Sequence, residues 1–428
     1  MSRRSLSIQD AALAVVKRLR DAGHEALWAG GCVRDMLLGI EPSDIDVATS
    51  AHPPQIVELF RRTREVGVQF GVVLVKQGPH WIEVATFRTD VNYVDGRRPE
   101  RVVFTTAEED AQRRDFTING LFYDPLDRRV IDYVGGEQDV RSGIVRAIGE
   151  PSHRFAEDHL RLLRAVRFTT RFGFQLDPAT AAAIREHAAG LARISAERIR
   201  EELQKMLERP TRADSLRLIG DLGLLPFLWP NARWTDEQLQ RAIRVLAALP
   251  AEADFVLSLA GLLREHPLRE VRRIGRALRC SNDEIADLAW LVERLDTIHV
   301  AELVCLPEFK RLVAHRRFDD LLALHRAVCI AQNLSLDAHE AARRRRDEIP
   351  PDQIAPPPLV TGDDLIALGL TPGPLFGAVL EALYDEQLDN RITQREQALE
   401  RMRRLVVDYQ RRMTNDEGTP SDESFSGS

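Results

Sequence analysis

The chain has 428 residues, of which 44% are hydrophobic and 29% charged, and its formal net charge is −7 at pH 7. This composition is typical of a folded protein of two to four domains and excludes wholesale disorder. No apolar run approaches the ~20 residues of a membrane helix, and no secretory signal is recognisable. Four cysteines without C-x-x-C spacing argue against a disulfide framework or a cysteine zinc site, so we expect a cytoplasmic protein.

The first 150 residues combine helix and strand patterns. Ser7 and Ser50 are helix-start signals, the second followed by two prolines. Two β-rich runs separated by Gly78-Pro79 predict an antiparallel hairpin. In chain order we expect a helix over 7–19, strands over 25–29 and 44–48, a helix over 50–62, and strands over 71–76 and 81–87.

Strand patterns stop near residue 157. Helical patterns broken by glycine and proline then continue to about residue 345. The proline-rich segment 347–358 is predicted to be a linker, and 359–413 a last helical unit. The acidic, Ser/Gly-rich segment 414–428 contains no base and is predicted to be disordered. The chain is thus expected to have a mixed head followed by a helical arm.

A glycine pair followed by two carboxylates forms the first candidate site. Gly30 and Gly31 end a predicted strand, where backbone N–H groups can approach a phosphate, and Arg34 follows one helical turn later. Asp44 and Asp46 alternate on the next strand, so they face the same side and repel by roughly 3 kcal/mol at an effective dielectric of 20. Mg²⁺ between them would reverse that repulsion. The alternative is a solvated pair of carboxylates on an exposed edge strand.

Glu83 is a candidate third carboxylate. It faces away from its strand neighbours, where a lone Glu is usually solvated, so its role as a metal ligand depends on the aspartate pair. The chain contains neither G-x-x-x-x-G-K-[ST] nor G-x-G-x-x-G, so neither a P-loop nor a dinucleotide fingerprint is supported.

Two arginine-bearing segments are candidates for phosphate contacts. The turn DGRR (95–98) is either a solvated hairpin tip or a loop that contacts a nucleotide. In RRDFTING (113–120), we expect Phe116 and Ile118 to pack inward while Arg114 reaches the site. The alternative for its arginines is an ordinary surface ion pair.

The segment EDHLRLLRAVRF (157–168) predicts one helix with a polar stripe. An ion-paired surface is the simpler interpretation. However, Asp and Arg one turn apart also offer acceptor and donor atoms to a base edge. The stripe contains Asp158, Arg161, Arg164 and Arg167, and the core face contains Leu160, Leu163 and Val166.

Taken together, these motifs resemble the class II tRNA nucleotidyltransferases and bacterial poly(A) polymerases, within the DNA polymerase beta-like nucleotidyltransferase superfamily. The matching segments follow the family's order, and 361–374 resembles its C-terminal tail more weakly. The segments are GGCVRDMLLG (30–39), DIDVAT (44–49), EVATFRTDVNYVDGRRPERVVF (83–104), RRDFTING (113–120), IDYVGGEQDVRSGIVRAIG (131–149) and RFAEDHLRLLRAVRF (154–168).

The resemblance implies an α+β fold with four parts. A nucleotidyltransferase head with a small mixed β-sheet and flanking helices is expected over 1–150, and an all-α neck that recognises the base over 151–210. A helical body over 211–346 and a helical tail over 359–413 would bind tRNA.

The resemblance also implies site roles. Asp44 and Asp46 would be the catalytic Mg²⁺ ligands with Glu83 as a helper, and Asp158 and Arg161 would select the base in place of a template. Further nucleotide contacts would be Gly31, Arg34, Arg114, Arg164 and Arg167, whereas Asp95, Arg97 and Arg98 would belong to the flexible loop of enzymes that add the terminal A.

The implied function is Mg²⁺-dependent, template-independent addition of CCA to tRNA 3′ ends from CTP and ATP, with release of pyrophosphate. An enzyme that adds only A, a poly(A) polymerase, and an RNA-binding protein with an inactive head are the alternatives. Many relatives carry a His-Asp metal dyad where this chain has Arg264-Glu265, so we expect no HD-type metal site. An acidic protein would bind RNA through local basic faces.

Overall fold

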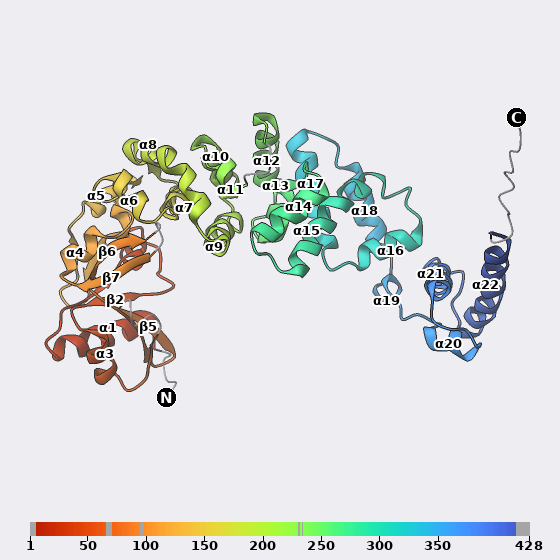
Figure 1. Cartoon of the computed structure of the whole chain (residues 1–428), viewed down its shortest axis with the longest axis horizontal. Coiled ribbons are helices and arrows are strands. Elements are labelled where there is room, and N and C mark those ends of the chain that lie inside the picture. The colour runs from red at the N-terminus through yellow and green to blue at the C-terminus, as the bar shows by residue number, and fades with distance from the viewer. Residues whose placement is uncertain (1–5, 66–70, 95–97, 230–231, 233, 417–428) are drawn as a thin grey trace, which may run out of the picture. The chain divides into compact units, whose positions relative to one another are not determined.

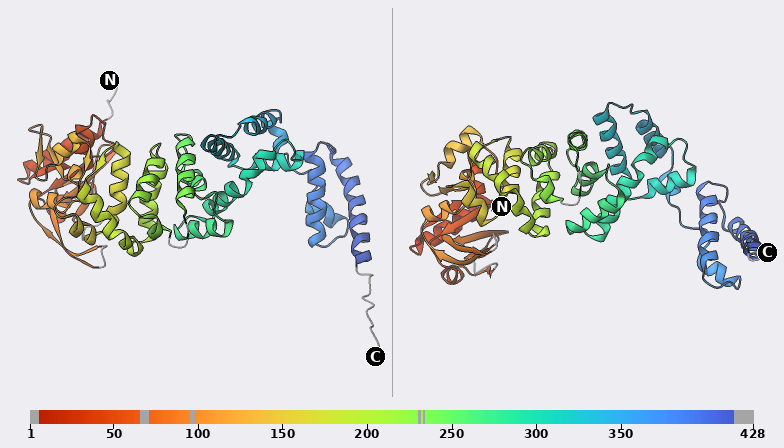
Figure 2. Two further views of the ribbon diagram at one scale, coloured as in Figure 1. Left: turned by 90° about the horizontal axis from the view of Figure 1, so that it is seen from above. Right: turned by 45° about the horizontal axis from the view of Figure 1, so that its top comes forward.

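The computed structural model describes residues 6–65, 71–94, 98–229, 232 and 234–416 (Figure 1). Its contacts divide the chain into two compact units, Met1–Ala289 and Trp290–Ser428. The expected α+β class is confirmed, because the large sheet lies in the N-terminal part and helices make up most of the rest (Figure 2). Over the described residues, no helix has the length and apolar character needed to span a membrane.

A seven-stranded mixed sheet forms the centre of the head, in the order β3-β4-β5-β2-β1-β8-β9. β2 and β5 are parallel, and the other neighbouring strands are antiparallel. The predicted hairpin is confirmed as β4 and β5, in which Val75 lies opposite Ile82. The strands are β1 (Ala26–Ala29), β2 (Asp46–Thr49), β3 (Thr63–Glu65), β4 (Val72–Gln77), β5 (His80–Thr86), β8 (Leu121–Asp124) and β9 (Arg129–Asp132).

Helices pack against this sheet. The backbone N–H of Asp10 donates to the Ser7 side chain, which caps the first helix as predicted. The helix predicted from Ser50 instead begins after His52 and is shorter than expected, because the chain enters β3 at Thr63. The head helices are α1 (Ile8–Asp21), α2 (Gly31–Leu37), α3 (Pro53–Leu59), α4 (Ala107–Gln112) and α5 (Gly136–Ser142).

Two small β pairs lie outside the main sheet. β6 (Arg88–Val94) and β7 (Arg98–Phe104) form an antiparallel hairpin in which Val94 pairs with Arg98. The predicted loop residues Asp95 and Arg97 lie outside the described residues. β10 (Ile144–Val145) pairs in parallel with β11 (Gln175–Leu176), so strand structure does extend past residue 157. Strands of two residues are too short to show the alternation of apolar and polar residues by which a strand is recognised in a sequence.

Apart from β11, the regular structure in the rest of the first unit is helical over the described residues. All nine residues of α13 (Phe255–Leu263) are buried, which makes it the central helix of its bundle. The other helices are α6 (Pro151–Glu157), α7 (Arg161–Phe172), α8 (Pro178–His187), α9 (Ala196–Leu207), α10 (Arg212–Asp221), α11 (Leu225–Leu228), α12 (Asp236–Ala248) and α14 (Leu268–Ala277); α15 (Asn282–Arg294) crosses the boundary between the units.

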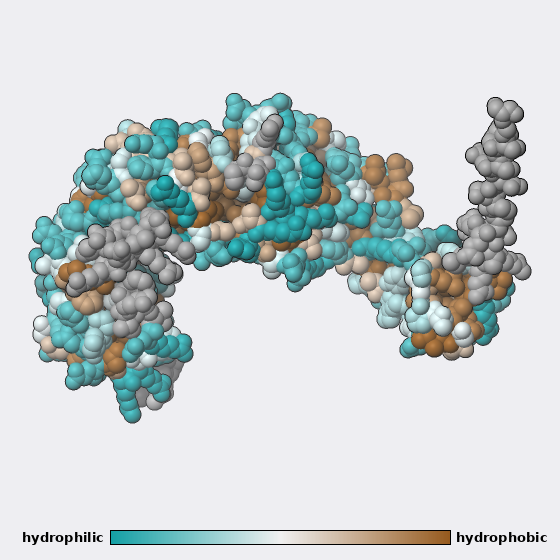
Figure 3. All heavy atoms as spheres, viewed as in Figure 1, coloured by the Kyte–Doolittle hydropathy of each residue, from teal (hydrophilic) through white to brown (hydrophobic). Residues whose placement is uncertain are grey.

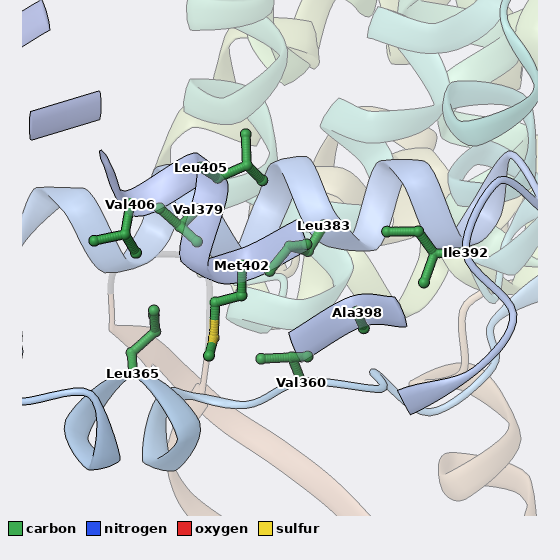
Figure 4. Packing of buried hydrophobic residues seen from close by; sticks show 9 residues of the cluster. All are labelled: Val360, Leu365, Val379, Leu383, Ile392, Ala398, Met402, Leu405 and Val406. Carbon is green, nitrogen blue, oxygen red and sulfur yellow. The ribbon is translucent and has the colours of Figure 1, made fainter. Parts of the chain in front are cut away.

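The second unit ends in a small helical core of its own. Leu365, Val379 and Met402 meet there, each from a different helix (Figure 4). Hydrophobic residues also reach the surface at the end of α20, where Ile366 in the helix and Leu368 just after it are exposed (Figure 3). The helices are α16 (Leu306–Ala314), α17 (Phe318–Gln332), α18 (Asp337–Asp347), α19 (Pro351–Ile354), α20 (Gly362–Ala367), α21 (Pro374–Leu388) and α22 (Arg395–Asp416).

The predicted linker and tail also contain helix. α19 is a single helical turn within 347–358. α22 continues to Asp416, past the start of the segment predicted to be disordered. The remainder of that segment lies outside the described residues.

Candidate active site

A cleft of about 600 Å³ in the first unit brings most of the predicted site residues together. This volume is within the usual range for small-molecule sites. The acidic side chains come from the region of β2 and β5, and most of the arginines come from helices. The carboxylate cluster consists of Asp44, Asp46 and Glu83, and the arginines include Arg34, Arg114, Arg161, Arg164, Arg167 and Arg198.

The carboxylate cluster is assembled by the one parallel strand pair of the sheet. Val47 of β2 pairs with Val84 of β5, so Asp46 and Glu83, each one residue earlier, lie side by side. Asp44 was expected on the strand, but β2 begins only at Asp46. Instead, Asp44 is exposed just before the strand and accepts a hydrogen bond from Ser43 Oγ at 3.0 Å. Both aspartates nonetheless line the cleft.

Like charges lie close together in the carboxylate cluster. Burial, followed by the charges of Glu83 and Asp44, raises the pKa of Asp46 to about 7. Burial is also the main cause that raises the pKa of Glu83. Within the part of the chain that the structure describes, no group of three or more His, Cys, Asp or Glu side chains has the arrangement of a metal site. A hard divalent cation that takes one or two carboxylates and substrate phosphates, such as Mg²⁺, fits this set of donors.

The glycine turn admits Arg114 to the cleft. Gly30 has φ +75°, and a Cβ there would lie 2.7 Å from Nη1 of Arg114, so both conformation and space favour glycine. Nη1 of Arg114 donates to the Asn119 carbonyl at 3.2 Å, and Nη2 donates to Asp110 at 2.9 Å. Phe116 and Ile118 are fully buried, as predicted.

Arg34 reaches the cleft but lies deep in its wall. It is 3% exposed, and its Nε and Nη2 donate to Asp35 at 2.8 and 2.6 Å. Nη1 donates to Asn119, and the guanidinium lies over the rings of Phe168 and Phe172. Arg34 thus links α2 to α7, while its contact with a nucleotide stays a prediction.

The single helix predicted across 157–168 is wrong. α6 ends at Glu157, Asp158 is extended with φ −148° and ψ 102°, and α7 begins at Arg161. Asp158 Oδ1 accepts the N–H of Leu160 at 3.0 Å, and its carbonyl accepts the N–H of Arg161 at 3.0 Å. Asp favours such helix starts because its side chain binds nearby backbone N–H groups. Asp158 therefore leads into α7 rather than lying on a continuous stripe.

The three arginines of the predicted stripe do lie on α7. Arg161 donates through Nη1 to Glu157 Oε2 at 2.5 Å, and Arg164 donates through Nε to Asp115 at 2.7 Å. Arg167 donates to Glu202 at 2.6 Å. Leu160, Leu163 and Val166 are buried, as predicted.

Sequence reasoning missed the residues that α9 contributes. Arg198 lines the cleft and donates to both oxygens of Asp158, at 3.1 and 2.7 Å. Glu202, one turn later, holds Arg167. No local motif marks either residue, because the contacts span 40 and 35 positions of the chain.

A small mixed sheet that presents paired carboxylates, followed by helices that supply arginines, is the arrangement of a nucleotidyltransferase. Residues 26–146 match the family model described as the poly A polymerase head domain. Residues 173–234 match the model described as a probable RNA- and SrmB-binding site of polymerase A.

Curated relatives and solved structures extend the match along the chain. The CCA-adding enzyme of Lactiplantibacillus plantarum is 33% identical over 405 residues, covering 93% of this chain and 96% of the relative. That of Latilactobacillus sakei is 37% identical over 384 residues, covering 87% and 92%. The crystal structure of the Bacillus stearothermophilus CCA-adding enzyme in complex with CTP is 30% identical, with a TM-score of 0.78 over 95% of this chain and 99% of that one. The chain belongs to the family of CCA-adding enzymes and bacterial poly(A) polymerases, and it is an RNA nucleotidyltransferase.

Proposed function

We propose that this protein adds CCA to the 3′ ends of tRNA from CTP and ATP in the cytoplasm, without a template, in a Mg²⁺-dependent reaction that releases pyrophosphate. The observation that carries the proposal is the cleft, where the carboxylate cluster and the Asp158–Arg161 pair line one cavity large enough for a nucleotide. The relatives named CCA-adding enzymes support the choice of product.

The carboxylate cluster would carry out the metal-dependent part of the reaction. Asp44 and Asp46 would hold Mg²⁺, with Glu83 as a helper; the bound metal supplies a lower pKa for the tRNA 3′-hydroxyl and charge stabilisation on the triphosphate. Gly31 and Arg114 would orient the triphosphate for in-line attack at its α-phosphorus. Positioning and charge stabilisation account for most of the catalysis in such a transfer.

Base selection would rest on the Asp158–Arg161 pair. The Asp158 carboxylate accepts hydrogen bonds and the Arg161 guanidinium donates them, which suits the exocyclic amino group and ring nitrogen of cytosine or adenine. Uracil presents an N3–H where cytosine has an acceptor. Each buried unpaired group costs on the order of 1–3 kcal/mol, so UTP would be rejected.

The four-part organisation is proposed along with the activity. Residues 1–150 would act as the catalytic head and 151–210 as the neck that recognises the base. The body over 211–346 and the tail over 359–413 would bind tRNA by its shape and its phosphates. Local arginines would provide these contacts despite the acidic net charge.

Primer extension tests the proposal. Purified protein with Mg²⁺ would receive tRNA transcripts ending before CCA, after C, and after CC, each with CTP, ATP or both. We expect the first transcript to gain CCA and extension then to stop. A single A added only to the CC-ending transcript would show an A-adding enzyme, and a long A tract would show a poly(A) polymerase. No extension by the parent protein would leave an RNA-binding protein with an inactive head.

A further inference from the structure

We propose that Arg198 is a specificity-determining positioning residue, which fixes the Asp158 carboxylate in the orientation that accepts C and A and rejects U. This inference rests on the proposed role of Asp158 in base selection. It assigns to α9 a part of the selection that the α6–α7 segment does not provide by itself.

The contact between the two side chains is bidentate. Nη1 of Arg198 donates to Oδ1 of Asp158 at 3.1 Å, and Nη2 donates to Oδ2 at 2.7 Å. Paired N–H groups of a guanidinium define the plane of a carboxylate as well as its position. The Asp158 side chain is 17% exposed and that of Arg198 is 29% exposed, so the pair is sheltered while it still lines the cleft.

Asp158 needs this support because its own segment does not fix the carboxylate plane. The residue has extended backbone between two helices, and the terminal torsion of aspartate is broad and roughly two-fold. The N–H of Leu160 donates only to Oδ1. A second, rigid contact is therefore required to hold both oxygens.

The helix α9 provides that rigidity. It carries Arg198 one turn before Glu202, whose Oε2 accepts from Arg167 at 2.6 Å. The side of the helix next to these two residues is buried through Ile199 and Leu203. α9 therefore contacts Asp158 through Arg198 and, one turn later, α7 through Glu202, with opposite charges at the two contacts.

A fixed carboxylate plane improves the discrimination of cytosine and adenine from uracil. Ionised Asp accepts hydrogen bonds and donates none, so lone pairs aimed at the base favour the amino group of cytosine or adenine over the carbonyl oxygen of uracil. Without Arg198, the carboxylate can rotate away and leave the base edge to Arg161 and water, both of which also pair with carbonyl oxygens. The structure thus predicts loss of discrimination before loss of catalysis.

The test compares kcat/KM for CTP and for UTP with a tRNA transcript that lacks CCA. For Arg198→Met we expect the CTP/UTP ratio to fall about 10- to 100-fold, the usual size of an effect from a residue that orients a ligating side chain. Arg198→Lys, which can hold one oxygen, is expected to retain part of the ratio. The matched control is Arg200→Met on the same helix, which removes a 2.6 Å contact with Glu284 and does not touch the cleft; its ratio should be unchanged.

The outcomes separate this inference from the proposed function. If Asp158→Ala loses the preference for CTP over UTP but Arg198→Met keeps it, then only the role of Arg198 is overturned. Asp158→Ala that keeps the preference for CTP and ATP overturns the base-selecting role and, with it, this inference. Equal losses in Arg198→Met and Arg200→Met would show a general structural effect and would also overturn it. Thermal unfolding identifies a misfolded variant, in which case the comparison of Arg198→Lys with Arg200→Lys decides the question.

Discussion

Arg164 and Asp115 form an ion pair that joins the head to α7. Nη2 and Nε of Arg164 lie 2.6 and 2.7 Å from Oδ2 of Asp115, whose other oxygen accepts from Asn119 Nδ2 at 3.0 Å. Asp115 is 8% exposed. The pair therefore holds the segment that carries Arg114 against α7, which carries Arg161, Arg164 and Arg167.

This pair predicts a specific acid sensitivity. Burial by itself raises the pKa of Asp115, but Arg164, Asn119 and Arg161 lower it to about 2, from 3.8 in the unfolded chain. Because the folded pKa is depressed, the stabilisation is present above about pH 4 and is lost as the pH falls through about 2. It amounts to about 2 kcal/mol at neutral pH.

We expect Asp115→Asn to lower the free energy of unfolding by about 2 kcal/mol at neutral pH and to flatten its dependence on pH between about 4 and 2. Urea unfolding over a pH series measures both effects. Asp214→Asn is the matched control, since Asp214 pairs with Arg217 at the surface, where the two side chains are 60% and 50% exposed. An Asp115→Asn variant with the parental slope would contradict the prediction.

The proposed role of Asp46 as a Mg²⁺ ligand predicts that metal binding would be coupled to proton release. Burial and the neighbouring carboxylates raise its pKa to about 7, and a metal ligand must be deprotonated. We expect Mg²⁺ affinity to fall as the pH drops from about 8 to about 6, with protons released on binding near pH 7. Calorimetric titration in buffers of different ionisation enthalpy measures the released protons. Asp46→Asn should abolish both binding and nucleotide addition, whereas an affinity independent of pH would refute the coupling.

The close packing around Gly136 predicts that a larger residue does not fit at this position. A Cβ at this position would lie 2.1 Å from the Thr117 carbonyl oxygen, so Gly136→Ala must displace the backbone of the segment that holds Asn119 and Arg114. We expect a loss of about 2–3 kcal/mol in the free energy of unfolding, together with lower activity. Gly377→Ala in α21 is the control, because nothing lies within 4 Å of its Cβ. It should gain up to about 1 kcal/mol, and equal effects of the two changes would contradict the argument.

The buried side chain of His325, in the second unit, predicts a second dependence of stability on pH. It is fully buried, its Nε2 lies 3.1 Å from Nδ1 of His299, and its ring stacks on His339. Burial, His299 and His339 lower its pKa from 6.5 to about 4. The unfolded state therefore binds more protons between these values, and the stability falls as the pH drops through this range.

The check is chemical unfolding of the full chain across that range. His325→Gln should reduce the slope of the free energy of unfolding against pH, because the side chain that titrates only after unfolding is gone. His153→Gln, at an exposed position of α6, is the control and should keep the parental slope. The same slope in both variants would rule out His325 as its source.

Local chemistry explains why much of the fold was predictable. Ser7 caps α1, the Gly78-Pro79 turn separates β4 from β5, and the glycines at 30 and 31 join β1 to α2, each through interactions within a few residues. The break at Asp158 was missed, because its helical periodicity continues across the residue. Only the backbone contacts with Leu160 and Arg161 reveal the new helix start.

The amino-acid sequence by itself determined the chemical types of the site: the paired carboxylates, the glycine turn and the arginines at helical spacing. These depend on residue identity and short-range spacing, and motif order was enough to recognise the family. Only the tertiary structure decided which charges meet. Pairing of β2 with β5 brings Asp46 beside Glu83, and packing of α9 on α7 brings Arg198 to Asp158. Such contacts join residues that are distant in the chain, and they depend on how the whole sheet and helical bundle bury their apolar faces.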